Sequence, residues 1–200
     1  MNVLHVGCGP RSFGGPLPPF DGPEWKETRL DIDPGCDPDI VADMCDMKGV
    51  ASAYFDGLWS SHNLEHVYWH DLPRVLGEFN RVLKPRGLCG ICVPDLQRVA
   101  EYVARDEVYH TLYEVGGLKI TPFDMMFGCR EIVRAGNAWM SHKGGFTATT
   151  LAGALFAFGF GRIRITRLGF DIIATCVKLA VGDAEDEGFL LCDEVANHVA

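Results

Sequence analysis

Val-Leu-His-Val-Gly-Cys-Gly, residues 3–9, is the stretch that decides the fold class of this chain. Residues typical of a buried strand run directly into two glycines, which allow a tight turn and the close approach of a ligand to the backbone. Residues 13–19 then hold three prolines and two glycines, a composition that excludes a helix. The stretch therefore predicts a strand that ends in a ligand-binding loop with no helix directly behind it.

Short apolar strands recur along the first half of the chain, at residues 28–31, 39–42 and 55–59, and each ends in a polar cluster. The clearest helix is predicted over residues 71–84, where apolar residues have the spacing of one buried helical face. A strand over residues 88–93 follows at once. Because a strand, a helix and a second strand form a βαβ unit, the sequence predicts an α/β fold with a mostly parallel sheet.

The middle of the chain fits this pattern less well. Residues 95–150 begin with an amphipathic helix near residues 95–105 and then carry several glycines and prolines. The segment is longer than a plain crossover connection needs. We interpret it as a cap or substrate lobe inserted into a single domain that spans residues 1–200.

The C-terminal part of the sequence completes the predicted sheet. A helix capped by Thr147 or Thr149 is followed by strands at residues 162–166 and 170–180. The short turn between these strands predicts an antiparallel hairpin. The acidic tail, residues 183–200, is expected to form a surface helix.

Composition and charge narrow the classes of partner. Lys and Arg number 18 against 27 Asp and Glu, and the net charge of −9 argues against nucleic acid or an anionic membrane as the main partner. No basic segment precedes the first apolar residues and no stretch is long and apolar enough to span a bilayer, so we expect a cytoplasmic protein. The eight cysteines are then expected to stay reduced.

A glycine-rich loop after one strand and an acid after the next is an arrangement that binds nucleoside cofactors. A dinucleotide site adds a third glycine and the N-terminus of a helix, which hold the pyrophosphate. Ser12 stands at the position of that third glycine, and the following prolines exclude the helix. S-adenosylmethionine, which has no pyrophosphate, fits this loop better, and a nicotinamide oxidoreductase is a more distant alternative.

The sequence resembles the class I S-adenosylmethionine-dependent methyltransferases of the type 11 group. The motifs that carry this resemblance are Val3-Leu-His-Val-Gly-Cys-Gly9, Leu30-Asp-Ile-Asp-Pro34, Ile40-Val-Ala-Asp-Met44, Asn63-Leu-Glu-His66 and Arg81-Val-Leu-Lys-Pro-Arg-Gly87. The resemblance implies a Rossmann-like, three-layer fold whose mostly parallel sheet has an antiparallel hairpin strand at its C-terminal end. It also implies S-adenosylmethionine as cofactor and S-adenosylhomocysteine as its product.

The resemblance assigns roles to residues at the strand ends. It implies that Gly7 and Gly9 lie against the methionine part of the cofactor and that Asp31 binds the ribose hydroxyls. It places Asp43 and Met44 beside the adenine. These residues follow three successive strands of the predicted sheet, and the carboxyl ends of parallel strands meet at one edge.

Two positions depart from the family pattern. His5 stands where the family usually has an acid, and Arg11 stands where its third glycine falls. Arg11 could instead bind the methionine carboxylate through two hydrogen bonds. Asp33 is an alternative to Asp31 for the ribose, although Asp31 is preferred because it ends the strand. With His5 and Ser61, these residues complete the predicted cofactor-binding set.

Two histidines are the candidate catalytic residues. His62 follows the fourth strand and has the ordinary pKa of a base that works near neutral pH. His142 lies in the presumed lobe and is the second candidate. His62, His66 and His70 also have a spacing that would place three imidazoles on one helical face, a pattern typical of zinc sites. A new helix start just beyond His70 weakens that interpretation, so no metal is predicted.

The sequence thus supports two functions. The first is methyl transfer from S-adenosylmethionine to a small-molecule or saccharide acceptor. The second is a methyltransferase-like module that holds the nucleoside cofactor without transferring a methyl group. It is suggested by His5, by Arg11 and by the lack of predicted helices before and after the first strand, where the family normally has them. The sequence leaves open whether the chain acts alone or as a homodimer.

Overall fold

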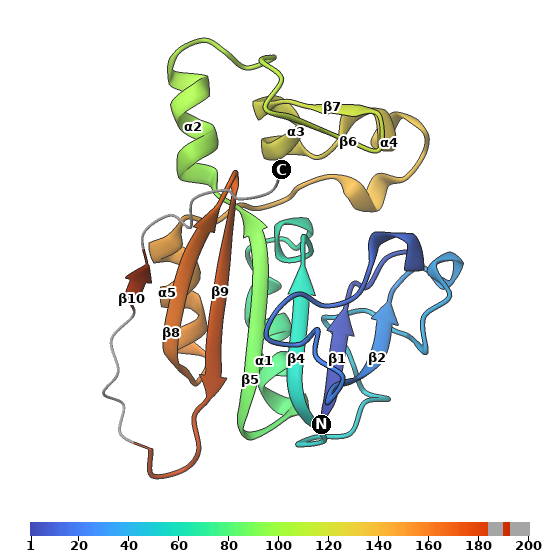
Figure 1. The fold of residues 1–200 in the computed structure, drawn as a ribbon, viewed down its shortest axis with the longest axis vertical. Coiled ribbons are helices and arrows are strands. Elements are labelled where there is room, and N and C mark those ends of the chain that lie inside the picture. The colour runs from blue at the N-terminus through green and yellow to red at the C-terminus, as the bar shows by residue number, and fades with distance from the viewer. Residues whose placement is uncertain (184–189, 193–200) are drawn as a thin grey trace.

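The computed structural model of this chain describes residues 1–183 and 190–192 (Figure 1). Its main sheet contains eight strands. They are β1 (Asn2–Val6), β2 (Lys26–Asp31), β3 (Ile40–Val41), β4 (Phe55–Ser61), β5 (Leu83–Pro94), β8 (Phe160–Leu168), β9 (Asp171–Lys178) and β10 (Leu190–Cys192). Their order across the sheet is β10-β8-β9-β5-β4-β1-β2-β3.

The directions of the strands confirm the predicted fold class. Strands β1 to β5 pair in parallel, and β9 runs antiparallel to both β5 and β8. The result is an α/β fold with a mostly parallel sheet and an antiparallel hairpin near its C-terminal edge. The carboxyl ends of the parallel strands all point to the upper end of the molecule in Figure 1.

The prediction of a surface helix over the acidic tail is wrong at residues 190–192. These residues form β10, which pairs in parallel with Arg164–Thr166 of β8. The reason is that β8 would otherwise be an edge strand, with unpaired backbone groups available to another strand. The other parts of the predicted tail helix, residues 184–189 and 193–200, lie outside the described residues.

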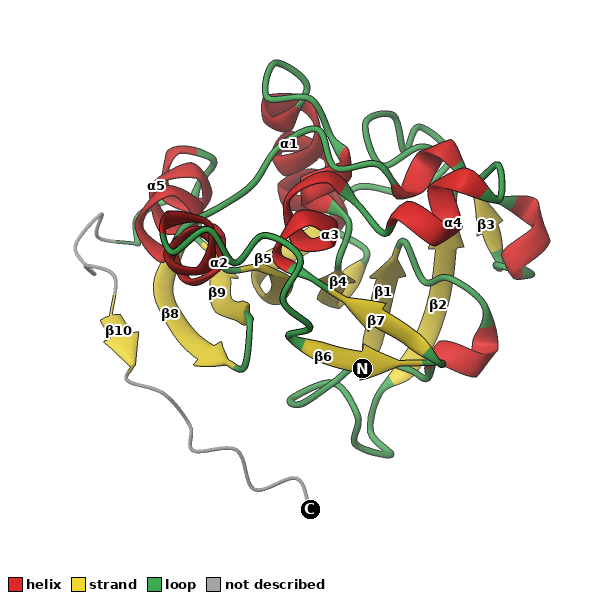
Figure 2. Cartoon of the chain, turned by 90° about the horizontal axis from the view of Figure 1, so that it is seen from above, coloured by secondary structure: helices red, strands yellow, loops and turns green. Residues whose placement is uncertain are grey.

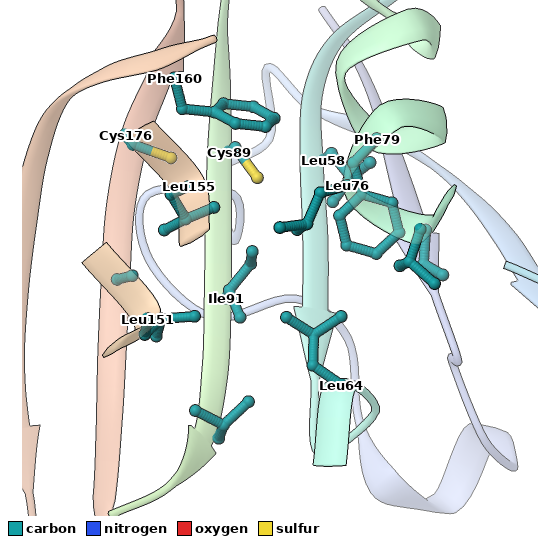
Figure 3. Packing of buried hydrophobic residues seen from close by; sticks show 14 of the residues in the cluster. Leu58, Leu64, Leu76, Phe79, Cys89, Ile91, Leu151, Leu155, Phe160 and Cys176 are labelled. Atoms are coloured by element: carbon teal, nitrogen blue, oxygen red, sulfur yellow. The ribbon is translucent and has the colours of Figure 1, made fainter. Parts of the chain in front are cut away.

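One face of the sheet packs against α1 (Leu72–Val82) and α5 (Ala148–Ala157). Figure 3 shows Leu76 and Phe79 of α1 and Leu151 and Leu155 of α5 directed at Leu58 and Ile91 of the central strands. Apolar residues of α1 recur at the spacing of one helical face, as the sequence predicted. Burial of this face is the main source of stability for the fold.

The opposite face of the sheet is covered in part by the loop between β1 and β2. Phe20 and Trp25 of this loop pack against Trp59 of β4. A Cβ at Gly57 or Gly90 would lie only 2.6 or 2.7 Å from the nearest ring atom of these aromatic residues. Glycines in the two central strands therefore allow a loop rich in proline to seal the sheet where a helix could not form.

A group of small elements lies beyond the carboxyl ends of the strands (Figures 1 and 2). It contains α2 (Leu96–Ala104), β6 (Tyr113–Val115), β7 (Leu118–Ile120), α3 (Pro122–Phe127) and α4 (Arg130–Arg134). Within this group, a small apolar cluster separate from the main core is formed by Val99, Ile120 and Met125. None of the helices in the described parts of the chain is long and apolar enough to cross a membrane.

Candidate functional site

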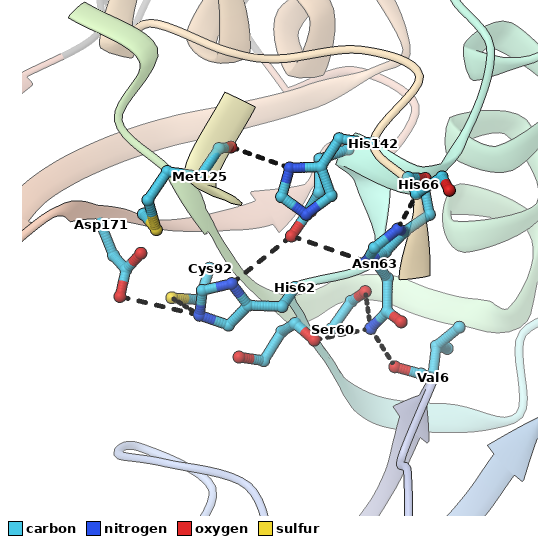
Figure 4. A network of polar contacts seen from close by, with 12 residues as sticks. Val6, Ser60, His62, Asn63, His66, Cys92, Met125, His142 and Asp171 are labelled. Carbon is cyan, nitrogen blue, oxygen red and sulfur yellow. Dashed lines mark hydrogen bonds and ion pairs between the residues drawn. The ribbon is translucent and has the colours of Figure 1, made fainter. Parts of the chain in front are cut away.

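The loop after β1 is held open by two glycines. Gly7 and Gly9 have φ angles of +63° and +57°, a region that glycine occupies without strain. The Asn63 amide nitrogen donates hydrogen bonds to the carbonyl oxygens of Val6 (2.9 Å) and Ser61 (2.8 Å), as Figure 4 shows. A Cβ on Gly7 would lie 1.9 Å from Asn63 Oδ1. The Asn63 side chain therefore packs directly on Gly7, and the loop that follows β4 braces the loop that follows β1.

Asp31 at the end of β2 organises the same region. Its Oδ2 accepts a hydrogen bond from the Gly9 amide (2.8 Å) and its Oδ1 accepts one from the Asp33 amide (2.9 Å). Arg29 is buried and donates to the carbonyl oxygen of Gly9. Asp33 is exposed and accepts from the Gly35 amide, where it caps the short turn Pro34–Cys36. Asp31 thus joins the ends of two neighbouring strands, whereas Asp33 faces solvent.

His5 and Arg11, two of the predicted cofactor residues, pair with carboxylates of other segments. His5 is buried within β1, and its Nδ1 lies 2.7 Å from Oε1 of Glu27 on β2. Burial lowers the pKa of His5 in spite of this carboxylate. Arg11 is 61% exposed and lies 3.4 Å from Asp37.

The remaining predicted cofactor residues follow β3 and β4. Asp43 is exposed, and its Oδ1 accepts a hydrogen bond from the Cys45 amide (2.8 Å). Met44 packs partly against the main core. Ser61 is the last residue of β4. Because β2, β1 and β4 are neighbours in the sheet, Asp31, Gly7 and Ser61 lie side by side at its carboxyl edge.

His62 stands at the exit from β4 between two carboxylates. Its φ of +52° is unusual for a residue with a side chain, and its backbone amide donates to the carbonyl oxygen of Cys92 (2.8 Å). Nδ1 lies 3.4 Å from Glu65 Oε1, and Nε2 lies 3.6 Å from Asp171 Oδ2 (Figure 4). The side chain is 44% exposed.

The two carboxylates decide the charge of His62. Enclosure by the protein opposes the charged form, but the contacts with Asp171, Cys92 and Glu65 outweigh it and hold the pKa of His62 well above its ordinary value. This shift favours the imidazolium form of the ring, which carries a proton on each nitrogen. A base role, as predicted from the sequence, requires that one of these protons leaves first.

His142 lies near Glu65 and His66. Its ring packs edge-to-face on the ring of His66, with centroids 4.8 Å apart. His142 Nδ1 lies 2.8 Å from the carbonyl oxygen of Met125, and burial lowers the pKa of this histidine. His70 is 77% exposed and lies beside Asp71. The spacing of His62, His66 and His70 therefore does not produce three imidazoles on one helix face, because Leu64–His66 forms only a short 3₁₀ turn.

Asp171 and Tyr113 are site residues that the sequence analysis missed. Asp171 begins β9 and reaches His62 across β5. Tyr113 stacks on Phe170 and donates a hydrogen bond to the sulfur of Met125 (3.2 Å). Burial raises the pKa of Tyr113 to about 12, so it stays neutral. No local sequence signal marks either residue, since Asp171 reaches the site through pairing of β9 with β5 and Tyr113 through its ring contact with Phe170.

Comparison with known proteins finds a family similarity in the N-terminal part of the chain. Residues 4–91 match the family of methyltransferase domains. The matched segment is similar to that family. It contains the glycine loop, Asp31 and the His62 turn described above. A search of curated protein sequences finds no match to the chain.

Solved structures with a similar fold are S-adenosylmethionine-dependent methyltransferases. One from Archaeoglobus fulgidus is 17% identical, with a TM-score of 0.57 over 88% of this chain and 86% of the other. One from Methanosarcina mazei is 16% identical, with a TM-score of 0.56 over 89% and 92%. At this level of identity the similarity shows a shared fold.

A third neighbour was solved with its ligands. It is the 1,6-didemethyltoxoflavin-N1-methyltransferase of Burkholderia thailandensis, with bound 1,6-didemethyltoxoflavin and S-adenosylhomocysteine. It is 17% identical, with a TM-score of 0.54 over 90% of this chain and 71% of the other. The match of residues 4–91 to methyltransferase domains and the Rossmann-like fold together support S-adenosylmethionine as the cofactor.

Proposed function

We propose that this methyltransferase domain transfers a methyl group from S-adenosylmethionine to a small-molecule acceptor. The observation that carries the proposal is the glycine loop at the carboxyl edge of the sheet, where Asn63 holds the backbone beside Gly7 and Asp31 accepts from the Gly9 amide. A neighbour of the same fold binds a small heterocyclic acceptor. A saccharide is the second class of acceptor that the sequence suggests.

In this proposal the cofactor lies along the carboxyl ends of β1, β2 and β3. Gly7 and Gly9 contact its methionine part, and the Asp31 carboxylate oxygens, each of which can accept a further hydrogen bond, bind the ribose. Asp43 and Met44 flank the adenine. His5, Arg11, Asp33 and Ser61 surround this set, and Arg11 is free to turn its exposed guanidinium toward the methionine carboxylate.

The acceptor lies between the sheet and residues 95–150, which act as a substrate lobe within one domain. His62 and His142 approach this space from the sheet and from the lobe respectively. Methyl transfer is a displacement in which the acceptor atom attacks the methyl carbon in line with the departing sulfur, so positioning supplies much of the catalysis. His62 positions the acceptor through its imidazole, and accepts a proton when the acceptor atom carries one and the ring is neutral. The free cysteines of the described chain fit a cytoplasmic enzyme.

The proposal is tested with the purified full-length chain in two measurements. Calorimetry with S-adenosylhomocysteine measures cofactor binding, and methyl-labelled S-adenosylmethionine with a panel of small-molecule and saccharide acceptors measures transfer. We expect binding and transfer of label to at least one acceptor. Binding without transfer to any acceptor or to cell extract would support the inactive module, and failure to bind the cofactor at millimolar concentration would exclude both.

His62→Ala tests the role of the imidazole. We expect kcat to fall by about a hundredfold, the scale of a lost acid–base or positioning group, while the affinity for S-adenosylhomocysteine stays unchanged. His70→Ala is the matched control, because His70 is an exposed histidine of the same loop. Loss of cofactor affinity in His62→Ala would instead show that the histidine supports the loop.

A further inference from the structure

Glu65 is a buried carboxylate that has histidines beside it but accepts no hydrogen bond of good geometry. The side chain is 1% exposed, and within the described chain neither carboxylate oxygen accepts a hydrogen bond. The nearest groups are His62 Nδ1 at 3.4 Å and His66 Nε2 at 4.0 Å, both from Oε1. Because an unpaired buried carboxylate is costly, the arrangement calls for a positive charge between these groups.

Two imidazoles beside Glu65 are oriented by the backbone. His66 Nδ1 lies 3.1 Å from the carbonyl oxygen of Ser141, and His142 Nδ1 lies 2.8 Å from that of Met125. A carbonyl oxygen only accepts hydrogen bonds, so each Nδ1 carries the proton. In the neutral rings each Nε2 then has a free lone pair. An Nδ1 anchored to a backbone carbonyl is the usual support of a histidine that binds metal through Nε2.

The donor atoms are close enough to share one ion. One ligand atom each from Glu65, His66 and His142 all lie within 4.8 Å of one another. An ion at the centre of three such atoms is at most about 2.8 Å from each, and shifts of under about 1 Å reach the zinc–nitrogen distance of about 2.0–2.1 Å. Side-chain rotation alone can make shifts of this size.

We propose that Glu65, His66 and His142 bind one divalent transition-metal ion of the zinc class. Two imidazoles and a carboxylate are borderline ligands that suit such ions, whereas magnesium and calcium prefer oxygen ligands only. Three protein ligands leave a fourth position for water or for the acceptor. The ion would also contact the Glu65 carboxylate, whose oxygens accept no hydrogen bond within the described chain.

The proposed ion would join two parts of the chain. Glu65 and His66 follow β4, whereas His142 belongs to the segment that returns from α4 to α5. The amides of Lys143 and Gly144 already donate to the backbone carbonyl oxygen of Glu65, at 2.7 and 3.0 Å. Metal binding would therefore fasten the end of the proposed lobe to the edge of the sheet.

A second cluster nearby is the main competitor. His62, Cys92 and Asp171 also place one ligand atom each within 4.8 Å of one another. His62 Nδ1 faces the Glu65 carboxylate at 3.4 Å rather than a backbone carbonyl, so its tautomer is not set in the same way. The two clusters differ in chemistry, since only the second contains a thiol. That difference makes them separable by experiment.

The test uses the full chain, stripped of metal with a chelator and titrated with Zn²⁺ and with Co²⁺. We expect one Zn²⁺ per chain and an increase in the unfolding temperature. The Co²⁺ spectrum should show visible bands typical of nitrogen and oxygen ligands, without the near-ultraviolet charge-transfer band of a thiolate. His142→Gln and Glu65→Gln should weaken Zn²⁺ binding by at least about tenfold. His70→Gln and Cys92→Ser should leave it unchanged.

Three results would overturn the proposal. The first is a folded wild-type chain that binds no Zn²⁺, and the second is binding that survives in His142→Gln with wild-type affinity. The third is a thiolate band with Co²⁺ together with loss of binding in Cys92→Ser, which would assign the ion to the other cluster. Because the cobalt spectrum is recorded on the wild-type chain, it decides the ligands even if a variant fails to fold.

Discussion

Asn63 and Gly7 form the contact that links the first loop of the sheet to the fourth strand. The Asn63 side chain occupies the space that a side chain on Gly7 would need. Its amide nitrogen satisfies carbonyl oxygens from both strands, Val6 of β1 and Ser61 of β4. The glycine is therefore required by this packing as well as by its positive φ.

Gly7→Ala should destabilise the protein by about 2–4 kcal/mol. The estimate combines about 1–2 kcal/mol for a left-handed residue with a Cβ and about 1 kcal/mol for each Asn63 hydrogen bond that is displaced. Urea unfolding measures the stability, and S-adenosylhomocysteine affinity should fall in the same variant. Gly15→Ala is the control, because a Cβ there meets no atom within 4 Å. Equal effects of the two substitutions would contradict this account.

Asp31 and Asp33 can be separated by replacing each with asparagine. If Asp31 binds the ribose, Asp31→Asn should weaken S-adenosylhomocysteine binding by about 1–3 kcal/mol, the scale of a lost charged hydrogen bond. Asp33→Asn should have little effect, because Asp33 is exposed and asparagine can also cap the turn at Pro34–Cys36. Calorimetry measures both affinities. The reverse result would move the ribose contact to Asp33.

The helix α3 shows how one element of the proposed lobe is stabilised. Thr121 accepts a hydrogen bond from the Asp124 amide, and the Asp124 carboxylate accepts one from the Thr121 amide, which together form a capping box. Arg130 Nε donates to Asp124 Oδ1 at 2.8 Å. Burial alone raises the pKa of Asp124, but the hydrogen bonds from Arg130 and Thr121 outweigh it and lower the pKa below its ordinary value.

Asp124→Asn should therefore destabilise the protein in a pH-dependent way. A lowered pKa in the folded state means that the ionised carboxylate stabilises the fold, fully so above its unfolded pKa of about 3.9. We expect a loss of about 1–3 kcal/mol at pH 7 that shrinks as the pH falls through the lowered pKa of Asp124. Urea unfolding at several pH values measures the difference from wild type. Glu101→Gln on the exposed side of α2 is the control, and a difference that is independent of pH would contradict the assignment.

At the scale of the whole molecule, Asp95 joins the sheet to the elements above it. Its backbone amide donates to the carbonyl oxygen of Phe170, and its Oδ1 accepts from the Gln97 amide at the start of α2. Its Oδ2 accepts from Arg167 Nε on β8 at 2.8 Å. The Asp95 side chain is 1% exposed, so this ion pair is shielded from solvent.

Arg167→Met should destabilise this junction by about 3 kcal/mol. Removal of one partner leaves the buried charge of Asp95 without compensation, and such losses are of about 3–5 kcal/mol. We expect a loss at the lower end of this range, because Asp95 Oδ1 keeps its hydrogen bond from the Gln97 amide at the start of α2. The double variant Asp95→Asn with Arg167→Met should recover part of the loss in urea unfolding. Arg164→Met, an exposed arginine of the same strand, is the control.

The order and type of elements followed from local sequence, but several boundaries did not. The predicted helix over residues 71–84 ends at Val82, because Leu83 already pairs with Phe55 of β4. β5 begins there instead of at residue 88, and a break in its register lies between the pairs of Phe55 and Gly57. The turn-like composition of residues 84–87 concealed this pairing. Strand pairing between distant segments decided these ends.

The position of the first loop of the site could be predicted from the sequence, because Gly7, Gly9 and Asp31 lie at strand ends that a parallel sheet must align. Their chemistry follows from residue type and position along one short segment. The surroundings of Glu65 were not readable, because His142 and Asp171 come from distant segments that meet only when the sheet and the elements above it are assembled. Local sequence patterns predict the strands and the glycine loop, and they indicate the similarity to methyltransferases. The charge state of His62 and the grouping of three metal-binding side chains depend on burial and through-space distance, which exist only in the folded chain.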